Sequence, residues 1–255
     1  MKILLTGHMG FIGTHLCNFL SMERVVRDGV LEFKHTVKGL DRNNQQDLLT
    51  CDLNYDVDLV IHLAGIASVR DSLQNPIKYW QNNVLASQKL FAAFPNTKII
   101  YASSSSAVEP ELNPYGFSKF AMEKIAPKNS LGLRFTTVWA EDGRADMFMS
   151  KLFKNNIQYI TEHTRDFIHV NDIVSAIDLL MTKDITGVID VGCGVSNSLK
   201  TLVDLAGIKN YEFKTGNVYE RMDNCANIKE LRDLGWEPKV NVIDYIKNKY
   251  HLTSV

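Results

Sequence analysis

Short apolar runs alternate along this chain with longer segments in which apolar residues recur at helical spacing. The runs predict buried β-strands at 2–6, 35–41, 58–64, 97–103, 132–138 and 187–192. The helical period predicts helices at 10–22, 77–93, 114–126, 145–155, 171–182, 198–206 and 241–250. Such alternation is typical of right-handed βαβ units, so we expect an α/β fold with a doubly wound parallel sheet of the Rossmann type.

The pattern is less regular in the last third of the chain, which reads as short strands, loops and small helices. We therefore predict a Rossmann domain over residues 1–140 and a mixed region over 141–255. The mixed region should form a small C-terminal lobe, with a segment at about 168–192 that returns to the Rossmann sheet.

Composition narrows the class of protein. The 255 residues are 45% hydrophobic and 22% charged, with a formal net charge of −1 and no long basic run, which argues against nucleic acid or a membrane surface as the main partner. The four cysteines show neither a CxxC pair nor a Cys/His ligand spacing, so we expect no metal site and a reducing compartment. The apolar run at the N-terminus is too short for a signal peptide, which favours a cytoplasmic protein.

A glycine-rich turn follows the first predicted strand. In "TGHMGFIG", Gly7, Gly10 and Gly13 surround Phe11 and Ile12 at the start of the first helix. Glycines here let the backbone approach a pyrophosphate, and the helix N-terminus offers free N–H groups to it. The spacing differs from G-x-G-x-x-G, and a plain βα turn is the alternative. Its place in an alternating chain favours dinucleotide binding.

The residue after the second Rossmann strand discriminates between cofactors. Asp41 can accept hydrogen bonds from both ribose hydroxyls and would repel a 2′-phosphate, which favours NAD. It lies further from Gly13 than usual because "SMERVVRDGVLEF" is inserted before the strand. Arg42 leaves NADP open, since an arginine here can bind a 2′-phosphate.

Two further segments are candidates for cofactor contact. Asp52 and Leu53 are placed to flank the adenine. Leu63, Ala64 and Gly65 end the strand predicted at 58–64, where small residues allow close approach of the cofactor.

Together these motifs resemble a known family. "TGHMGFIGTHL", "DLVIHLAGIASVRDS", "NNVLASQKL", "YASSSSAV", "PYGFSK", "TRDFIHVNDIVSAI", "DVGCG" and "LGWEP" occur in the family's order over nearly the whole chain. The chain is thus similar to extended short-chain dehydrogenases/reductases of the nucleotide-sugar epimerase/dehydratase family, in which UDP-galactose 4-epimerase is the best-known relative.

The stretch "NPYGFSKF" carries the chemistry that the resemblance implies. Tyr115 and Lys119 lie one helical turn apart on the same face, and an ammonium near a phenol lowers the pKa of the phenol. The resemblance implies that Tyr115 is the acid/base, that Lys119 also holds the nicotinamide ribose, and that Asn83 braces this region. Outside this context, a tyrosine and a lysine at this spacing would read as a surface pair.

A serine should form a hydrogen bond with the same substrate hydroxyl as the tyrosine. The run "YASSSSAV" leaves open which serine this is. Counting from the strand start selects Ser104, whereas counting back from Val108 selects Ser105. The loop before the catalytic helix is shorter than is usual in the family, so the register is not fixed. We favour Ser104.

The same run discriminates among reactions. Sugar dehydratases of the family carry an acidic pair after the serine, and this chain has no acidic residue before Glu109. The resemblance therefore implies an NAD-dependent epimerase that transiently oxidises a sugar hydroxyl, expected at C4, and returns hydride to the opposite face. An NADP-dependent keto-sugar reductase and a dinucleotide-binding regulatory protein with a decayed site are the alternatives.

Three residues of the C-terminal region are candidates for nucleotide-sugar binding. Arg165 in "TRDF" matches a family arginine that contacts the diphosphate, and Arg221 is a candidate second clamp, since arginine suits phosphate oxygens. Thr137 stands where many relatives have an asparagine that touches a substrate phosphate.

Relatives also suggest a homodimer through the helices at about 77–93 and 114–126. Trp80, Phe91, Phe94 and Met122 are apolar enough to form such a face, and core packing would explain the same residues.

Overall fold

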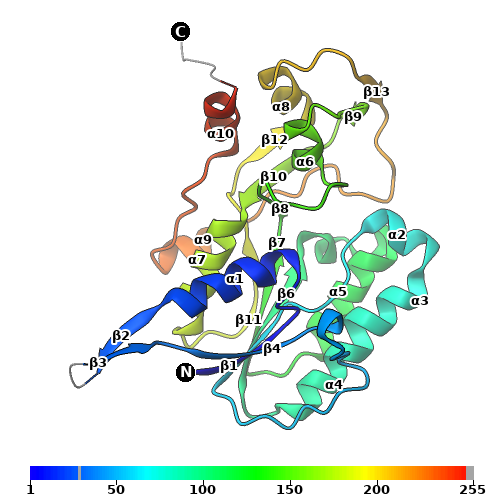
Figure 1. Cartoon of the computed structure of the whole chain (residues 1–255). Coiled ribbons are helices and arrows are strands. Elements are labelled where there is room, and N and C mark those ends of the chain that lie inside the picture. Colours follow the sequence, from blue (N-terminus) through cyan, green and yellow to red (C-terminus); the bar gives the residue numbers. More distant parts are fainter. Residues whose placement is uncertain (28–29, 251–255) are drawn as a thin grey trace. The chain divides into compact units, whose positions relative to one another are not determined.

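The computed structural model describes residues 1–27 and 30–250, which divide into two compact units (Figure 1). Of the described residues, those within 1–134 and 177–189 form the first unit, and those within 135–176 and 190–250 form the second. Each unit has its own core and is described separately below.

A six-stranded sheet forms the centre of the first unit. Its order is β11-β7-β6-β5-β1-β4, and the pairs β1–β4, β1–β5 and β5–β6 are parallel. These strands are β1 (Lys2–Thr6), β4 (Thr36–Leu40), β5 (Leu59–His62), β6 (Lys98–Ser104), β7 (Ser130–Phe135) and β11 (Gly187–Val191). All six coincide with predicted strands, which confirms the α/β fold with a Rossmann-type parallel sheet.

The strand order also locates a binding crevice. From β1 the chain goes first to β4 on one side and then to β5 on the other. Parallel α/β sheets bind ligands outside the carboxyl ends of the strands at such a reversal. The glycine turn after β1 therefore lies where a cofactor is expected.

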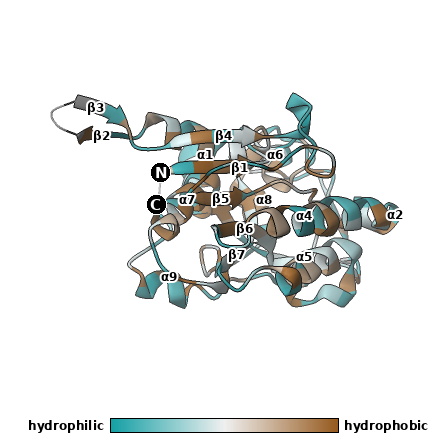
Figure 2. Cartoon of the chain, turned by 90° about the horizontal axis from the view of Figure 1, so that it is seen from below, coloured by the Kyte–Doolittle hydropathy of each residue, from teal (hydrophilic) through white to brown (hydrophobic). Residues whose placement is uncertain are grey.

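Helices cover the sheet because its strands are apolar on both faces. Leu4, Val60 and Ile99 pack in one cluster with Leu90 of α4 (Ala86–Ala93) and Met122 of α5 (Pro114–Ile125). The alternate strand positions are fully buried as well, which requires cover on the other face. Figure 2 shows the central strands β5 and β6 coloured mainly as hydrophobic.

The predicted helix at 77–93 contains an irregularity. It begins as α3 (Pro76–Tyr79), continues as a π-helical segment (Trp80–Leu85) and ends as α4. Single π turns inside helices occur mostly at functional sites. The segment contains Asn83, whose side chain is fully buried.

Other elements of the first unit were predicted only in part. Helix α1 (Phe11–Met22) agrees with prediction, whereas the inserted segment forms an antiparallel hairpin of β2 (Arg24–Arg27) and β3 (Val30–Phe33) that projects as an arm (Figure 1). Helix α2 (Val69–Gln74) was not predicted. The described part of this unit also contains short 3₁₀ turns at Arg42–Asn44, Ser105–Val108 and Pro110–Leu112.

The predicted strand at 132–138 is in fact two strands. β7 ends at Phe135 in the large sheet, and β8 (Thr137–Trp139) pairs with β10 (Thr164–His169) in a three-stranded sheet completed by β12 (Ser196–Ser198). One continuous apolar run thus serves two sheets, and periodicity alone cannot reveal that change of partner.

The second unit is built from small elements around one apolar cluster, which includes Trp139, Phe167, Leu202 and Ile246. A two-stranded sheet pairs β9 (Tyr159–Thr161) with β13 (Glu212–Lys214). The helices are α6 (Phe148–Phe153), α8 (Leu199–Leu205), α9 (Lys229–Asp233) and α10 (Val242–Lys249). Helix α7 (Val170–Met181) follows β10 in the chain and agrees with the helix predicted at 171–182.

The apolar face predicted for a dimer is corrected by the structure. Phe91, Phe94 and Met122 are at most 5% exposed and belong to the core, whereas Trp80 is 41% exposed. In residues 1–27 and 30–250 we find no helix that is long and apolar enough to cross a membrane.

Candidate functional site

The glycine turn after β1 is packed so closely that side chains would not fit. Gly7 adopts a φ of +72°, and a Cβ on it would lie 2.6 Å from the backbone nitrogen of Ala64. A Cβ on Gly13 would lie 2.0 Å from the carbonyl oxygen of Gly7. Gly10 is the N-cap of α1, and no described side chain caps its first amides. This cradle and the uncapped helix start fit the pyrophosphate of a dinucleotide.

Phe11 and Ile12 form the first turn of α1, directly beyond the cradle. Both are partly buried, and the ring of Phe11 meets that of His15 edge-on at 5.6 Å. They place the backbone at the helix start rather than supply polar contacts.

Asp41, the predicted ribose-binding residue, lies against the glycine turn. One carboxylate oxygen accepts a hydrogen bond from the backbone nitrogen of Met9 at 3.1 Å, and the other accepts from that of Asn43 at 2.9 Å. Arg42 is directed elsewhere: it donates to Asp47 at 2.9 Å and to the side-chain oxygen of Asn82 at 2.5 Å.

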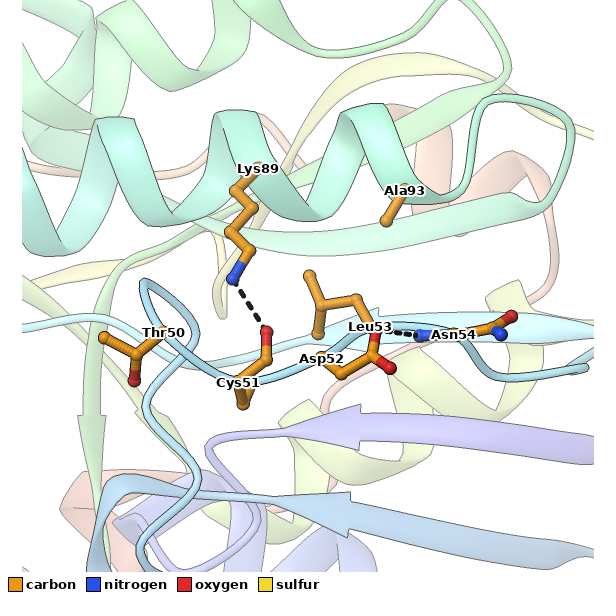
Figure 3. Close-up of a pocket in the computed structure, with 7 residues that line it drawn as sticks. All are labelled: Thr50, Cys51, Asp52, Leu53, Asn54, Lys89 and Ala93. Carbon is orange, nitrogen blue, oxygen red and sulfur yellow. Dashed lines mark hydrogen bonds between the residues drawn. The ribbon is translucent and has the colours of Figure 1, made fainter.

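Asp52 and Leu53 line a pocket of about 540 Å³ between their loop and α4 (Figure 3). Leu53 is 6% exposed, and the Asp52 carboxylate accepts from the backbone nitrogen of Asn54 at 3.1 Å. Lys89 of α4 closes one side by donating to the carbonyl oxygen of Cys51 at 2.7 Å. The two predicted adenine residues thus share one concave surface.

The turn after β5 packs directly on the end of β1. Leu63 donates its backbone N–H to the Thr6 carbonyl at 3.0 Å, and Ala64 donates to the Thr6 hydroxyl at 3.4 Å. A Cβ on Gly65 would lie 3.0 Å from the side-chain oxygen of Asn83 and 3.4 Å from the Lys119 ammonium. The predicted cofactor turn and the predicted catalytic lysine therefore meet at Gly65.

Lys119 is a buried cation. Its side chain is 5% exposed on α5 and donates to the carbonyl oxygen of Ala102 at 2.8 Å. Burial lowers the pKa of Lys119 to about 8, and the nearby Glu123 partly opposes that shift. A lysine with this pKa can change its charge near neutral pH, which suits a catalytic centre.

Tyr115 stands at the start of α5 because Asn113 caps that helix. The Asn113 side chain accepts from the backbone nitrogen of Gly116 at 2.7 Å, and Pro114 occupies the first helical position. The Tyr115 ring meets Tyr79 edge-on, with 6.1 Å between ring centroids. Burial and the neighbouring Asp71 raise the pKa of Tyr79 to about 12, so Tyr79 stays neutral.

The serines of the run "YASSSSAV" differ in their positions and in the hydrogen bonds of their side chains. Ser103 donates to Glu123 at 2.5 Å, and Glu123 also forms a two-pronged ion pair with Arg134. Ser104 ends β6 and accepts from the backbone nitrogen of Ser106 at 3.2 Å, with no donor bond of its own hydroxyl found among the described residues. Ser105 begins the following 3₁₀ turn and is buried.

Asn83 is a fully satisfied clamp in the π-helical segment. Its side-chain oxygen accepts from the backbone nitrogen of Ile66 at 2.9 Å. Its side-chain nitrogen donates to the Ile66 carbonyl at 3.0 Å and to the Ser118 hydroxyl at 2.9 Å. It therefore ties the turn after β5 to the helix that carries Tyr115 and Lys119.

In the second unit, the two predicted arginines lie close together, Arg165 on a strand and Arg221 on a loop. Arg165 on β10 pairs with Glu220 at 3.0 Å and donates to the carbonyl oxygen of Arg221 at 2.9 Å. The side chain of Arg165 is only 15% exposed. Thr137 accepts from the side chain of Asn224 at 3.1 Å. Arg165 and Arg221 thus lie near two carboxylates, those of Glu220 and Asp223.

Sequence reasoning missed several residues of this region. Tyr79, Ser118 and Glu123 touch or support the predicted centre, but nothing in their local sequence distinguishes them from core residues. Glu220 was missed because its partner lies 55 positions away in the chain. Within residues 1–27 and 30–250, we find no group of three His, Cys, Asp or Glu side chains arranged for a metal ion.

Comparison with known proteins gives a consistent result. A family model described as the NAD dependent epimerase/dehydratase family matches residues 3–192. A putative UDP-glucose 4-epimerase of Methanocaldococcus jannaschii is 28% identical over 96% of both chains. An uncharacterized UDP-glucose epimerase, YtcB, of Bacillus subtilis is 29% identical over 98% of this chain and 96% of its own. The UDP-glucuronic acid 4-epimerase of Bacillus cereus, solved with UDP-glucuronic acid and NAD, superposes with a TM-score of 0.82 at 25% identity over 98% of each chain.

Proposed function

Because the chain belongs to the NAD-dependent epimerase/dehydratase family, we propose that it is an NAD-dependent nucleotide-sugar 4-epimerase. The observation that carries the proposal is the meeting of Lys119, Asn83 and Gly65 beside the end of β5, with Tyr115 one helical turn before the lysine. Relatives named as UDP-glucose 4-epimerases support the choice of a UDP-sugar and of the C4 position.

The residues of the first unit suit NAD better than NADP. Gly7, Gly10 and Gly13 would hold the pyrophosphate, and Asp41 would accept from the adenosine ribose hydroxyls. Arg42 is engaged with Asp47 and is thus drawn away from the role of a 2′-phosphate partner. Bound NAD supplies the acceptor, and later the donor, of the hydride.

The chain's own residues handle the proton. Tyr115 removes the proton from the sugar hydroxyl as the carbon is oxidised, and it returns a proton when the carbonyl is reduced on its other face. Lys119 stabilises the phenolate, since a buried ammonium one turn away favours the charged form of tyrosine. The edge-on contact with Tyr79 limits the movement of the Tyr115 ring. Such acid/base help contributes about 10²–10⁴-fold to the rate.

We assign the supporting hydroxyl to Ser104 rather than to Ser105. Ser103 is occupied by Glu123, which leaves the later serines as candidates. The Ser104 oxygen accepts a backbone N–H from Ser106, which polarises its hydroxyl toward donation to a substrate oxygen. Ser105 lies within a 3₁₀ turn.

The nucleotide portion of the substrate is assigned to the second unit, with residues 1–140 as the cofactor domain and 141–255 as the mixed, substrate-binding region. Arg165 on β10 contacts the backbone of Arg221, and the two side chains together offer forked donors for a diphosphate. Thr137 lines the same strand layer and would add one hydroxyl contact.

A homodimer is proposed through a face that differs from the one expected from sequence. Ile77, Trp80 and Phe117 are 72%, 41% and 49% exposed, and the rings of Trp80 and Phe117 stack at 6.2 Å. Exposed, adjacent apolar side chains of this size are typical of an interface.

The nucleotide released by denaturing the purified protein tests the proposal. An epimerase regenerates NAD in each cycle and should release NAD, whereas protein that releases no nucleotide and oxidises NADPH with a keto-sugar would be a reductase. A panel of UDP-, dTDP- and GDP-sugars should then give C4 epimerisation of a UDP-sugar. Absence of turnover with every sugar would support the decayed regulatory protein instead.

The variant Tyr115→Phe tests the mechanism. Turnover should fall by at least ~10²-fold while NAD stays bound, because only the proton transfer is lost. Tyr55→Phe is the matched control, since Tyr55 is a partly buried tyrosine that packs against the core of the first unit. Equal rates for the two variants would remove Tyr115 from the mechanism.

A further inference from the structure

A buried histidine that the proposed mechanism does not use connects the strand end before the glycine turn to the helices of the proposed catalytic centre. His62 ends β5 and is 1% exposed. Its Nδ1 lies 2.7 Å from the Thr6 hydroxyl, directly before the glycine turn, and its Nε2 lies 2.8 Å from the Ser87 hydroxyl on α4. Ser87 in turn lies 2.6 Å from the backbone carbonyl oxygen of Asn83.

For a neutral imidazole, only one order of donors satisfies these hydrogen bonds. A carbonyl oxygen accepts and cannot donate, so the hydroxyl hydrogen of Ser87 must point to Asn83. The alternative acceptor of that hydrogen, the thioether sulfur of Met122 at 3.2 Å, is weak. The Ser87 oxygen then accepts from the Nε2–H of His62, and the Nδ1 of His62 accepts from the Thr6 hydroxyl. Burial of the ring favours the neutral form, and the neutral His62 is then in its Nε2–H tautomer.

These hydrogen bonds continue from Asn83 to the catalytic helix. The side-chain nitrogen of Asn83 donates to the Ser118 hydroxyl at 2.9 Å, and Ser118 donates to the carbonyl oxygen of Tyr115 at 2.7 Å. The residue next to Ser118 is Lys119, whose ammonium lies beside Gly65. One continuous set of hydrogen bonds thus runs from the end of β1 to the backbone of the catalytic tyrosine.

We propose that His62 is a positioning residue of the reaction, a neutral Nε2–H imidazole that fixes Asn83 and, through Ser118, the placement of Tyr115 and Lys119. A positively charged residue could not take this position, because a second positive charge would face the Lys119 ammonium in a buried site. An apolar residue could not take this position either, because Thr6 and Ser87 would lose a buried hydrogen-bond partner. The kinetic part of this proposal rests on the function proposed above.

The tautomer can be measured directly on the protein. Nitrogen-15 spectra of the histidine-labelled chain should show His62 with a protonated Nε2 and a bare Nδ1, unchanged from pH 8 to pH 5. A His62 that carries its proton on Nδ1, or that gains a second proton in this range, would overturn the proposal. This measurement needs no substrate, so it stands even if the proposed reaction is wrong.

Kinetics of matched variants test the positioning role. His62→Leu should lower kcat by about 10²-fold, since small misplacements of reacting groups cost this much. Ser87→Ala should also lower kcat. Ser130→Ala removes another buried serine, whose hydroxyl donates, among the described residues, only to the Pro127 carbonyl, and it should leave kcat unchanged.

Two further readouts separate positioning from general loss of stability. In His62→Leu the pH at which kcat is half-maximal should move upward, because a displaced Lys119 stabilises the Tyr115 phenolate less. His62→Gln, which keeps a donor and an acceptor, should recover part of kcat. An unchanged pH profile and equal effects of the Ser87 and Ser130 variants would refute the proposal.

Discussion

Replacing His62 by glutamine should make the free energy of unfolding of this protein less sensitive to acidic pH. Burial, with a smaller contribution from the Lys119 charge, lowers the pKa of His62 from 6.5 to about 3. In the unfolded chain the same imidazole takes up a proton near its ordinary pKa. Between these two values the unfolded state binds one more proton than the folded state, so the free energy of unfolding falls as the pH falls.

The size of the effect follows from the two pKa values. At pH 7.5 the histidine is neutral in both states and the proton contributes about 0.1 kcal/mol. At pH 5 the unfolded histidine is almost fully protonated, and the folded state loses about 2 kcal/mol. Glutamine does not titrate, so the wild type should lose about 2 kcal/mol more than His62→Gln over this range.

Urea denaturation of both proteins, followed by circular dichroism at several pH values from 7.5 to 5, measures this difference. All other titrating groups are shared, so the difference between the two curves isolates His62. Any constant cost of the glutamine itself appears as an offset that does not vary with pH. Parallel stability curves would refute the reasoning, because they would mean that His62 is protonated in the folded protein.

Three other predictions concern cofactor, substrate and assembly. Gly13→Ala should abolish retention of NAD, measured as nucleotide released on denaturation, because its Cβ would lie 2.0 Å from the Gly7 oxygen; normal retention would contradict the cradle. Glu220→Gln should tighten UDP binding by ~10-fold (about 1.4 kcal/mol) in calorimetry, because the carboxylate competes for Arg165, whereas weaker binding would make Glu220 a structural support. Trp80→Glu should convert dimer to monomer in sedimentation velocity, and an unchanged dimer would place the interface elsewhere.

The catalytic region shows how far short-range signals reach. The spacing of Tyr115 and Lys119 is a local property of a helix, and Asn113 with Pro114 fixes where that helix begins. The choice among the serines is different. It rests on contacts of the folded chain: Glu123, 20 positions away, takes up the Ser103 hydroxyl, and the backbone N–H of Ser106 donates to Ser104. Counting along the sequence could not decide this, because the loop before the helix is shortened.

The apolar residues of the two helices give a second example. Phe91, Phe94 and Met122 were candidates for a dimer face, yet they pack against the sheet. Apolar character favours burial without specifying the partner, so sequence alone could not separate core from interface. The exposed stack of Trp80 and Phe117 joins residues of different helices and is visible only in three dimensions.

By itself, the sequence determined the six strands of the sheet, most of the helices, the glycine turn and the spacing of Tyr115 and Lys119 on one helix, because periodicity, turn chemistry and helical spacing act between near neighbours. Only the tertiary structure decided the neutral state of His62, the engagement of Arg165 by Glu220 and the break between β7 and β8. Charge state, hydrogen-bond partner and sheet membership depend on groups far apart in the chain, and burial, which sets their energies, exists only after folding.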